Sequence, residues 1–296
     1  MISINPKTEK TSLVHAMMLG SIAPRPIAFV STIDKNGIPN LSPFSFFNAF
    51  GAKPPIVAFS PARRVRDNTI KHTLENVREI GEVVINMVNY AMVQQSSLAS
   101  CEYPKGVNEF EKAGFTQLAS EIVKPYRVRE SPVQMECIVK EVIETGHEGG
   151  AGNLVICEIV LMHISETILD EHGMIDPQKI DLVARMGADW YCRASGSSVF
   201  KVEKPNLHLG VGVDRIPANF RFSKILSGND LGILGNIHEL PIEEEVSEMK
   251  NSPEFKEIIL ISDALHREEK LHYYIKNLIG EGKVIDAWKV ILLSNS

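Results

Sequence analysis

The sequence has no uninterrupted apolar run of the roughly 18–20 residues that a membrane-spanning helix requires. Its first residues also lack the basic stretch and following apolar stretch of a secretory signal. The four cysteines form no Cys-x-x-Cys pair and are irregularly spaced, which is typical of reduced thiols rather than of a disulfide framework. These absences predict a cytoplasmic protein with no membrane segment.

Positive charge is also scarce, since 31 Lys and Arg residues face 37 Asp and Glu residues, for a net charge of −6. Proteins that bind nucleic-acid backbones usually have the opposite balance. Nucleic acid is therefore not an expected partner, although a local basic patch can still bind a small anion. The apolar share of 44% is that of an ordinary globular protein.

Several catalytic signatures are missing. The sequence contains no His-Glu-x-x-His, no phosphate-binding Gly-x-x-x-x-Gly-Lys-Ser/Thr loop and no Gly-x-Ser-x-Gly elbow. Gly210 and Gly212 lack the third glycine and the strand–helix context of a dinucleotide-binding fingerprint. The histidines are scattered, so no metal site is predicted.

Hydrophobic patterning predicts a mainly β fold over residues 1–200. Residues 27–45 form a predicted hairpin around an Asn-Gly turn, and residues 132–143 and 153–164 form a second one with a glycine-rich tip. Further strands are expected at 56–60 and 83–88, and short helices at 11–19, 68–80 and 90–99, the second of them capped by Asn68. This pattern favours an antiparallel barrel with flanking helices.

Residues 201–296 are predicted to form a helical C-terminal extension. Ser252 and Pro253 resemble a helix start, and residues 263–279 are apolar at helical spacing. The sequence leaves open whether this part is a separate domain or wraps around the barrel.

One candidate binding segment spans residues 40–50, which contain four phenylalanines, two serines and two asparagines. A strand with core phenylalanines and serines at turns explains this composition. A platform for a flat, amphipathic ring system explains it equally, because such a ligand needs apolar surface and polar groups at its rim.

A second candidate segment spans residues 60–73, where Arg63, Arg64, Arg66 and Lys71 face a single acid, Asp67. The local charge of +3 in an acidic protein, next to an expected helix start, is what a phosphate site needs. An ordinary solvated loop with surface arginines explains the composition equally well.

Six motifs in order resemble the flavin reductase-like family, the FMN-binding split-barrel group that includes flavoredoxin. They are GSIAPRPIAFVST at 20–32, GIPNLSPFSFF at 37–47, PPIVAFS at 54–60, KHTLEN at 71–76, SPVQMEC at 131–137 and NLVICEIVLMH at 153–163. The resemblance covers roughly residues 8–200. His72 stands where the family usually has an aspartate.

This resemblance implies a six-stranded split barrel that binds FMN and works as a homodimer, with the flavin near the subunit interface. It also implies a set of site residues. Those for the ring and the ribityl chain are Asn40, Leu41, Ser42, Pro43, Ser45, Phe46 and Phe47; those for the phosphate are Ser60, Arg63, Lys71 and Thr73; and His163 is the candidate catalytic residue beside the flavin.

The implied activity is that of an NAD(P)H-dependent flavin reductase, in which hydride passes from NADH or NADPH to flavin N5. Such chemistry belongs to the cofactor, so the protein needs no nucleophile of its own. A monooxygenase or another redox protein is a possible partner. Two alternatives stay open: a flavoredoxin-like carrier that receives electrons from a protein, and a cofactor-free interaction module.

Overall fold

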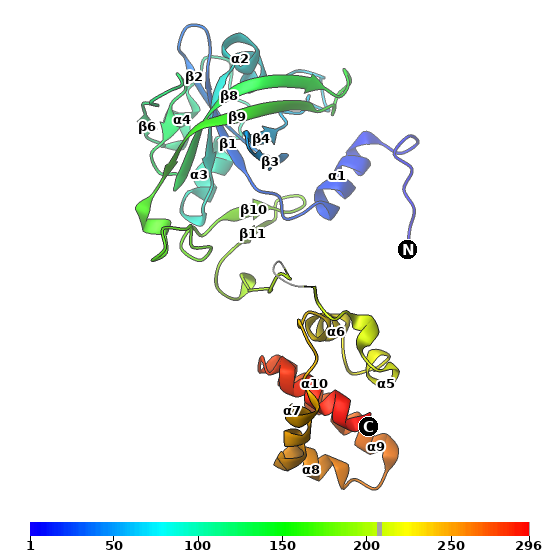
Figure 1. The fold of residues 1–296 in the computed structure, drawn as a ribbon. Coiled ribbons are helices and arrows are strands. Elements are labelled where there is room, and N and C mark those ends of the chain that lie inside the picture. Colours follow the sequence, from blue (N-terminus) through cyan, green and yellow to red (C-terminus); the bar gives the residue numbers. More distant parts are fainter. Residues whose placement is uncertain (206–208, 296) are drawn as a thin grey trace. The chain divides into compact units, whose positions relative to one another are not determined.

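The computed structural model describes residues 1–205 and 209–295. The chain forms two compact units, Met1–Phe200 and Lys201–Ser296 (Figure 1). Within the described residues, no helix combines the length and apolar content needed to cross a membrane.

The first unit is built on a seven-stranded antiparallel sheet with the order β2-β1-β5-β8-β9-β4-β3. Its strands are β1 (Ala28–Ile33), β2 (Pro39–Phe44), β3 (Phe47–Ala52), β4 (Pro55–Phe59), β5 (Glu82–Met87), β8 (Val133–Glu144) and β9 (Asn153–Ile164). Two small ribbons pair β6 (Gln117–Leu118) with β7 (Arg127–Val128) and β10 (Val183–Arg185) with β11 (Tyr191–Arg193). The helices of this unit are α1 (Thr11–Ser21), α2 (His72–Ile80), η1 (Tyr90–Met92), α3 (Val93–Leu98), α4 (Glu109–Ala113), η2 (Glu166–Ile168) and η3 (Gly196–Ser198).

The sheet is strongly curled, because its two outer strands are joined almost directly. β2 ends at Phe44 and β3 begins at Phe47, so about 11 Å of chain at most links them. Seven strands laid flat would place the outer ones about 29 Å apart. The sheet therefore bends so that the end of β2 lies close to the start of β3, with Ser45 and Phe46 between them.

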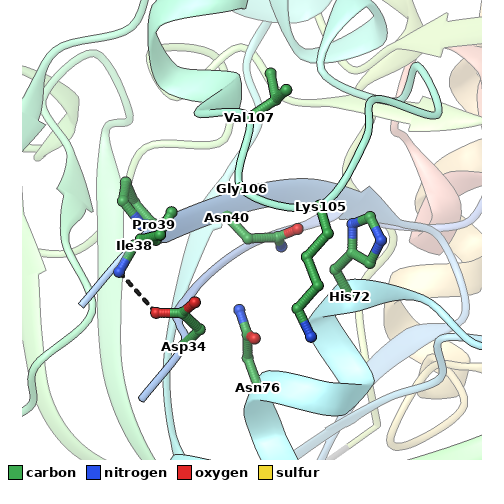
Figure 2. Close-up of a pocket in the computed structure, with 9 residues that line it drawn as sticks. All are labelled: Asp34, Ile38, Pro39, Asn40, His72, Asn76, Lys105, Gly106 and Val107. Atoms are coloured by element: carbon green, nitrogen blue, oxygen red, sulfur yellow. Dashed lines mark hydrogen bonds between the residues drawn. The ribbon is translucent and has the colours of Figure 1, made fainter. Parts of the chain in front are cut away.

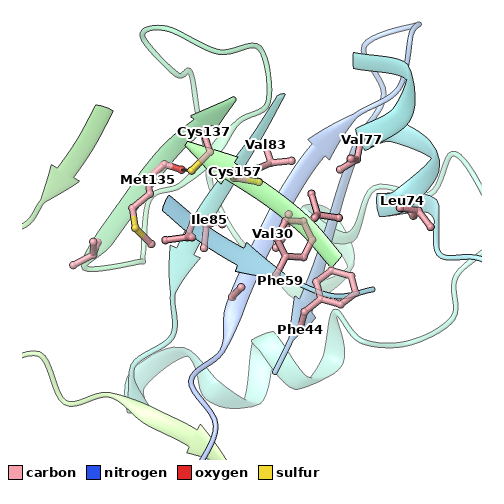
Figure 3. Packing of buried hydrophobic residues seen from close by; sticks show 14 of the residues in the cluster. Val30, Phe44, Phe59, Leu74, Val77, Val83, Ile85, Met135, Cys137 and Cys157 are labelled. Carbon is pink, nitrogen blue, oxygen red and sulfur yellow. Dashed lines mark hydrogen bonds between the residues drawn. The ribbon is translucent and has the colours of Figure 1, made fainter. Parts of the chain in front are cut away.

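The main core lies inside this curl. Val30, Phe44, Phe59 and Ile85 are buried there, and α2 adds Leu74 and Val77 (Figure 3). Two cysteines, Cys137 and Cys157, complete the cluster as free thiols. Burial raises the pKa of Cys157 to about 12, and burial together with Cys157 and Glu136 also raises that of Cys137. Both thiols are thus inert at neutral pH.

A second apolar cluster covers the other face of β1 and β2. It joins Phe29 and Leu41 to Met92 of η1, Phe110 of α4 and Val128 of β7. Because both faces are covered, every residue of β1 is buried, including the polar Ser31 and Thr32.

The free edge of β2 carries almost no hydrogen-bond donors. Residues 39, 41 and 43 alternate toward that edge, and two of them, Pro39 and Pro43, have no N–H. The N–H of Leu41 donates to Glu109 Oε2 over 3.0 Å. Glu109 is 5% exposed, and burial raises the pKa of its carboxyl group.

The structure confirms both predicted hairpins and corrects two other predictions. The sheet has seven strands rather than six, because residues 47–52 form the edge strand β3. Helix α2 begins at His72 instead of after Asn68. Asn68 has a φ of 58°, a left-handed conformation that a helix N-cap does not adopt.

The second unit is helical. Its elements are η4 (Val213–Arg215), α5 (Ala218–Arg221), α6 (Gly228–Gly235), α7 (Glu243–Glu248), η5 (Met249–Asn251), α8 (Pro253–Ile259), α9 (Ala264–Gly280) and α10 (Val284–Ser294). The predicted helix start at Ser252 is confirmed, since its hydroxyl accepts the N–H of Phe255. Trp288 is fully buried in this core and donates to the carbonyl of Leu234 over 2.8 Å.

Candidate functional site

The basic loop, residues 61–71, is held in one shape by Asn68. Arg63 donates to the side chain and the carbonyl of Asn68, with Nε–Oδ1 and Nη2–O distances of 2.6 and 2.9 Å. The Asn68 amide donates in turn to the carbonyl of His147, in the loop between β8 and β9. A residue in left-handed conformation thus ties two distant segments together.

The glycine-rich tip of the β8–β9 hairpin packs directly on this loop. The N–H of Arg63 donates to the carbonyl of Ala151, and the N–H of Gly150 donates back to Arg63. A Cβ atom on Gly149 would lie 3.0 Å from the carbonyl oxygen of Val65. The tip therefore needs glycine so that two backbones can approach closely.

Three cations of the basic loop converge on one carboxylate. The Arg64 Nε and Arg66 Nη2 atoms lie 2.8 and 3.0 Å from the Glu102 carboxylate oxygens, and Lys71 Nζ lies 3.8 Å away. Hydrogen bonds from Arg64 and Arg66 lower the pKa of Glu102. Asp67 also bonds Arg66, but Thr69 takes its other oxygen. These three cations face two carboxylates, Glu102 and Asp67, so the cluster keeps a net positive charge.

Lys71 stands at the start of α2, whose first turn no side chain caps. The uncapped N–H groups and the helix dipole favour an anion at this end. Burial, followed by the charge of Arg64, lowers the pKa of Lys71. Glu102, at 3.8 Å, and Asp67 act in the opposite direction but do not outweigh these two causes.

Small polar side chains lie next to this helix start. Asn40 of β2 donates to Thr73 Oγ1 over 2.9 Å, and Asn76 of α2 donates to Thr32 Oγ1 over 3.0 Å. All four are buried. The N-terminal turn of α2 is thereby fixed against the strands that carry the polar groups.

These elements border an open recess whose cavity volume is about 20 Å³. Its lining consists of Asn40, Ser42, Arg64, Lys71, His72, Thr73, Ala99, Ser100, Cys101, Glu102, Tyr103 and Glu109. We call it the cationic recess. A volume of this size holds about one or two water molecules and is well below the range for whole drug-sized ligands, so only one end of a larger ligand can enter it.

A neighbouring recess shares Asn40 and His72 with the first. Figure 2 shows Lys105 and Asn76 facing this space, and Asp34 accepting the N–H of Ile38. Burial is the main cause that lowers the pKa of His72, so its imidazole is neutral at pH 7. His72 therefore adds no charge to the cationic recess at that pH.

The predicted site residues divide into separate groups. Asn40, Ser42, Lys71 and Thr73 come together in the cationic recess. Ser45, Phe46 and Phe47 lie at the corner between β2 and β3, outside that lining. There Ser45 Oγ accepts from Arg25 Nε over 3.3 Å, and the Phe46 ring meets the His15 ring of α1 edge-on.

Four other predicted residues are placed elsewhere. Leu41 is fully buried in the outer apolar cluster, and Pro43 shares its face of β2. The Ser60 hydroxyl accepts the N–H of Asn153, and the Arg63 guanidinium donates to Asn68 Oδ1. The recess therefore uses Arg64 where the sequence analysis named Arg63.

His163 lies at the opposite end of the β8–β9 hairpin from the tip that supports the basic loop. Its Nε2 atom is 2.8 Å from Glu136 Oε1, and its Nδ1 atom is 3.7 Å from Glu121. Ten residues of extended strand separate it from Asn153, about 33 Å. His163 does not line the cationic recess.

Sequence reasoning missed Arg64, Glu102 and Glu109 as recess residues. Arg64 lay within the basic segment, but only the turn at Asn68 determines which arginine faces the recess. Glu102 and Glu109 carry no local signal, because tertiary contacts alone bring them there. Among the described residues, no group of three or more His, Cys, Asp or Glu side chains is arranged to hold a metal ion.

Comparison with known proteins identifies the class to which this fold and recess belong. The model of the flavin reductase like domain matches residues 19–179, more than half of the chain and wholly within the first unit. The chain therefore belongs to the flavin reductase-like family.

Individual relatives agree with this assignment. An uncharacterised protein of Aquifex aeolicus is 37% identical over 189 residues, 64% of this chain and 94% of the relative. Component B of nitrilotriacetate monooxygenase from Bacillus cereus is 29% identical with a TM-score of 0.64, over 68% of this chain and 98% of that one. A Shewanella frigidimarina protein described as a flavin reductase with a split barrel domain is 27% identical with a TM-score of 0.57, over 67% and 95%.

Proposed function

We propose that this protein is an FMN-binding, NAD(P)H-dependent flavin reductase. The observation that carries the proposal is the cationic recess, which joins Arg64, Lys71 and the uncapped start of α2 to the polar side chains of β2. This arrangement lies within the part of the chain that matches the flavin reductase family.

The recess suits the phosphate of FMN. A phosphate dianion needs several donors and a positive field, and two cations beside a helix N-terminus supply both. Lys71, only 29% exposed in its side chain and 3.8 Å from its nearest carboxylate, has donors available. Asn40 and Ser42 would then lie toward the ribityl chain, as the sequence analysis expected.

The redox chemistry is supplied by FMN when bound, which accepts hydride at N5 from NADH or NADPH. The chain's part is to bind and orient. Arg64 and Lys71 fix the phosphate end, and the Asn40–Thr73 hydrogen bond keeps β2 and α2 at a constant spacing.

A visible spectrum of the purified protein, followed by anaerobic titration with NADH and NADPH, tests this function. We expect bound or added FMN to be reduced, and steady nicotinamide oxidation when excess flavin is present. A flavin that stays oxidised with both nicotinamides, yet accepts electrons from a redox protein, would instead favour the flavoredoxin-like carrier. Failure to bind any flavin would remove the proposal and leave an interaction module.

Variants at the recess test the phosphate site. Replacing Arg64 and Lys71 by alanine should weaken FMN binding at least about tenfold, because two charge-assisted contacts are lost. Riboflavin, which has no phosphate, should bind equally to both proteins. Lys105→Ala is the matched control, since Lys105 pairs with Glu75 outside the cationic recess.

We also propose that the protein is a homodimer. Helix α1 has no buried residue, and it exposes Leu13, Met17 and Met18. The edge strand β3 likewise exposes Phe50, which is 68% accessible. A second copy that covers this surface would remove apolar area from water. Light scattering should give twice the chain mass, and Met17→Glu with Met18→Glu should reduce it to one.

A further inference from the structure

Glu102 occupies the place that an anionic ligand of the cationic recess would take. It is the only described carboxylate that the structure pairs with Arg64 or Lys71. Arg64 donates to one of its oxygens and Arg66 to the other, so the carboxylate bridges two guanidinium groups as a phosphate does.

The exposures show which partner can move. The Arg64 and Lys71 side chains are 16% and 29% exposed, whereas Glu102 is 43% exposed. Arg64 is further fixed by bonds to Thr69 Oγ1 and to the carbonyl of Ile70, both 2.8 Å. Glu102 can therefore rotate into water while the two cations stay in place.

We propose that Glu102 is a built-in competitor for the phosphate of the ligand, and this inference rests on the proposed function. The phosphate brings a charge near −2 at neutral pH, and a carboxylate on the same cations would repel it. Binding thus displaces Glu102 from Arg64 and Lys71, and release of the ligand lets it return. Glu102 weakens retention of FMN and favours exchange of the flavin.

The consequence is specific for the phosphate. Glu102→Gln removes the competing charge but keeps an amide oxygen that can accept from Arg64. We expect this variant to bind FMN about three- to tenfold more tightly, a modest factor because the pairs are partly exposed. Its affinity for riboflavin should not change.

The test is a set of dissociation constants for FMN and riboflavin in the wild-type full chain, Glu102→Gln and Glu79→Gln. The last variant makes the same change in net charge on the outer side of α2, where the exposed Glu79 accepts the N–H of Lys35. The decisive quantity is the ratio of the riboflavin constant to the FMN constant. It should rise in Glu102→Gln alone, and inorganic phosphate should compete with FMN more strongly in that variant.

The outcomes separate the two proposals. A wild-type protein that binds FMN no better than riboflavin would refute the phosphate site itself. A wild-type preference for FMN that stays constant or falls in Glu102→Gln would refute only the role of Glu102. If Glu102→Gln does not fold, Glu102→Ala is measured in the same way. If neither folds, Glu102 is a structural ion-pair partner and the inference is wrong.

Discussion

Glu136 offers the sharpest test of how the first unit is stabilised. Its side chain is completely buried at the base of β8, and its oxygens accept the N–H groups of Glu121, Ile122 and Val123 at 2.9, 2.7 and 3.1 Å. One oxygen also lies 2.8 Å from His163 Nε2. A single carboxylate thus fixes a whole loop to the sheet.

Glu136→Ala would leave three backbone donors without their acceptor. Each donor left without an acceptor costs about 1 kcal/mol or more, so we expect the free energy of unfolding to fall by about 3 kcal/mol. For a unit of this size that corresponds to a fall in melting temperature of about 6–12 °C. Glu121→Ala is the control, because Glu121 keeps its backbone N–H and its side chain is 64% exposed; it should cost less than about 0.5 kcal/mol.

Scanning calorimetry, with hydrogen exchange of residues 119–125 as a local readout, measures both effects. The melting temperature of the first unit should fall, and hydrogen exchange in that loop should become faster. With the exposed Trp190 of the first unit replaced by phenylalanine, fluorescence of the buried Trp288 monitors the second unit, whose transition should be unaffected. A Glu136→Ala transition within about 2 °C of wild type would refute the reasoning.

The same carboxylate makes the stability of the first unit depend on pH, and the sign of this dependence follows from its pKa. Burial alone would raise the pKa of Glu136, but the N–H groups of the loop and His163 outweigh it, and the pKa is lowered. The unfolded chain therefore binds the proton more readily. The contribution to stability is complete above the unfolded value of about 4.3 and is lost as pH falls through the lowered folded pKa.

Three further predictions concern other parts of the chain. Gly149→Val should loosen the basic loop against Val65 and weaken FMN binding in titration, whereas unchanged affinity would show that the hairpin tip does not support the site. Burial lowers the pKa of His272, so the stability of the second unit should fall as pH drops below about 6.5. A Trp190→Phe variant, in which Trp288 is the sole tryptophan, should show this as a lower melting temperature by fluorescence, whereas a flat profile from pH 7 to 5 would contradict it. A thiol reagent should modify exposed Cys101 in the native protein and the two core cysteines only after unfolding, and early modification of the core would argue against the packing.

Much of the fold follows from local pattern. The hairpin at 27–45 and the long hairpin of β8 and β9 were predictable, because alternation and turn residues act over a few positions. Strand β3 was not, since its residues are exposed along nearly its whole length and show no alternation between buried and exposed positions. Its pairing with β4 is decided by the curl of the sheet.

The candidate site was predictable only in part. The sequence indicated a basic segment and a polar strand, and the structure brings Asn40, Ser42, Lys71 and Thr73 together. It could not indicate that Arg64 rather than Arg63 lines the recess, because this depends on the left-handed conformation of Asn68. Nor could it indicate Glu102, whose role arises from contacts far apart in the chain.

The proline-rich edge of β2 bears on how copies of this protein can associate. An incoming strand would find carbonyl oxygens there but no available N–H, because Pro39 and Pro43 lack one and Glu109 already holds that of Leu41. A strand that pairs with this edge could therefore form at most about half of the usual backbone hydrogen bonds. Fibril formation through this edge is disfavoured for the same reason. Self-association on this side of the sheet must instead depend on side-chain packing, which single substitutions can strengthen or weaken while the sheet stays intact.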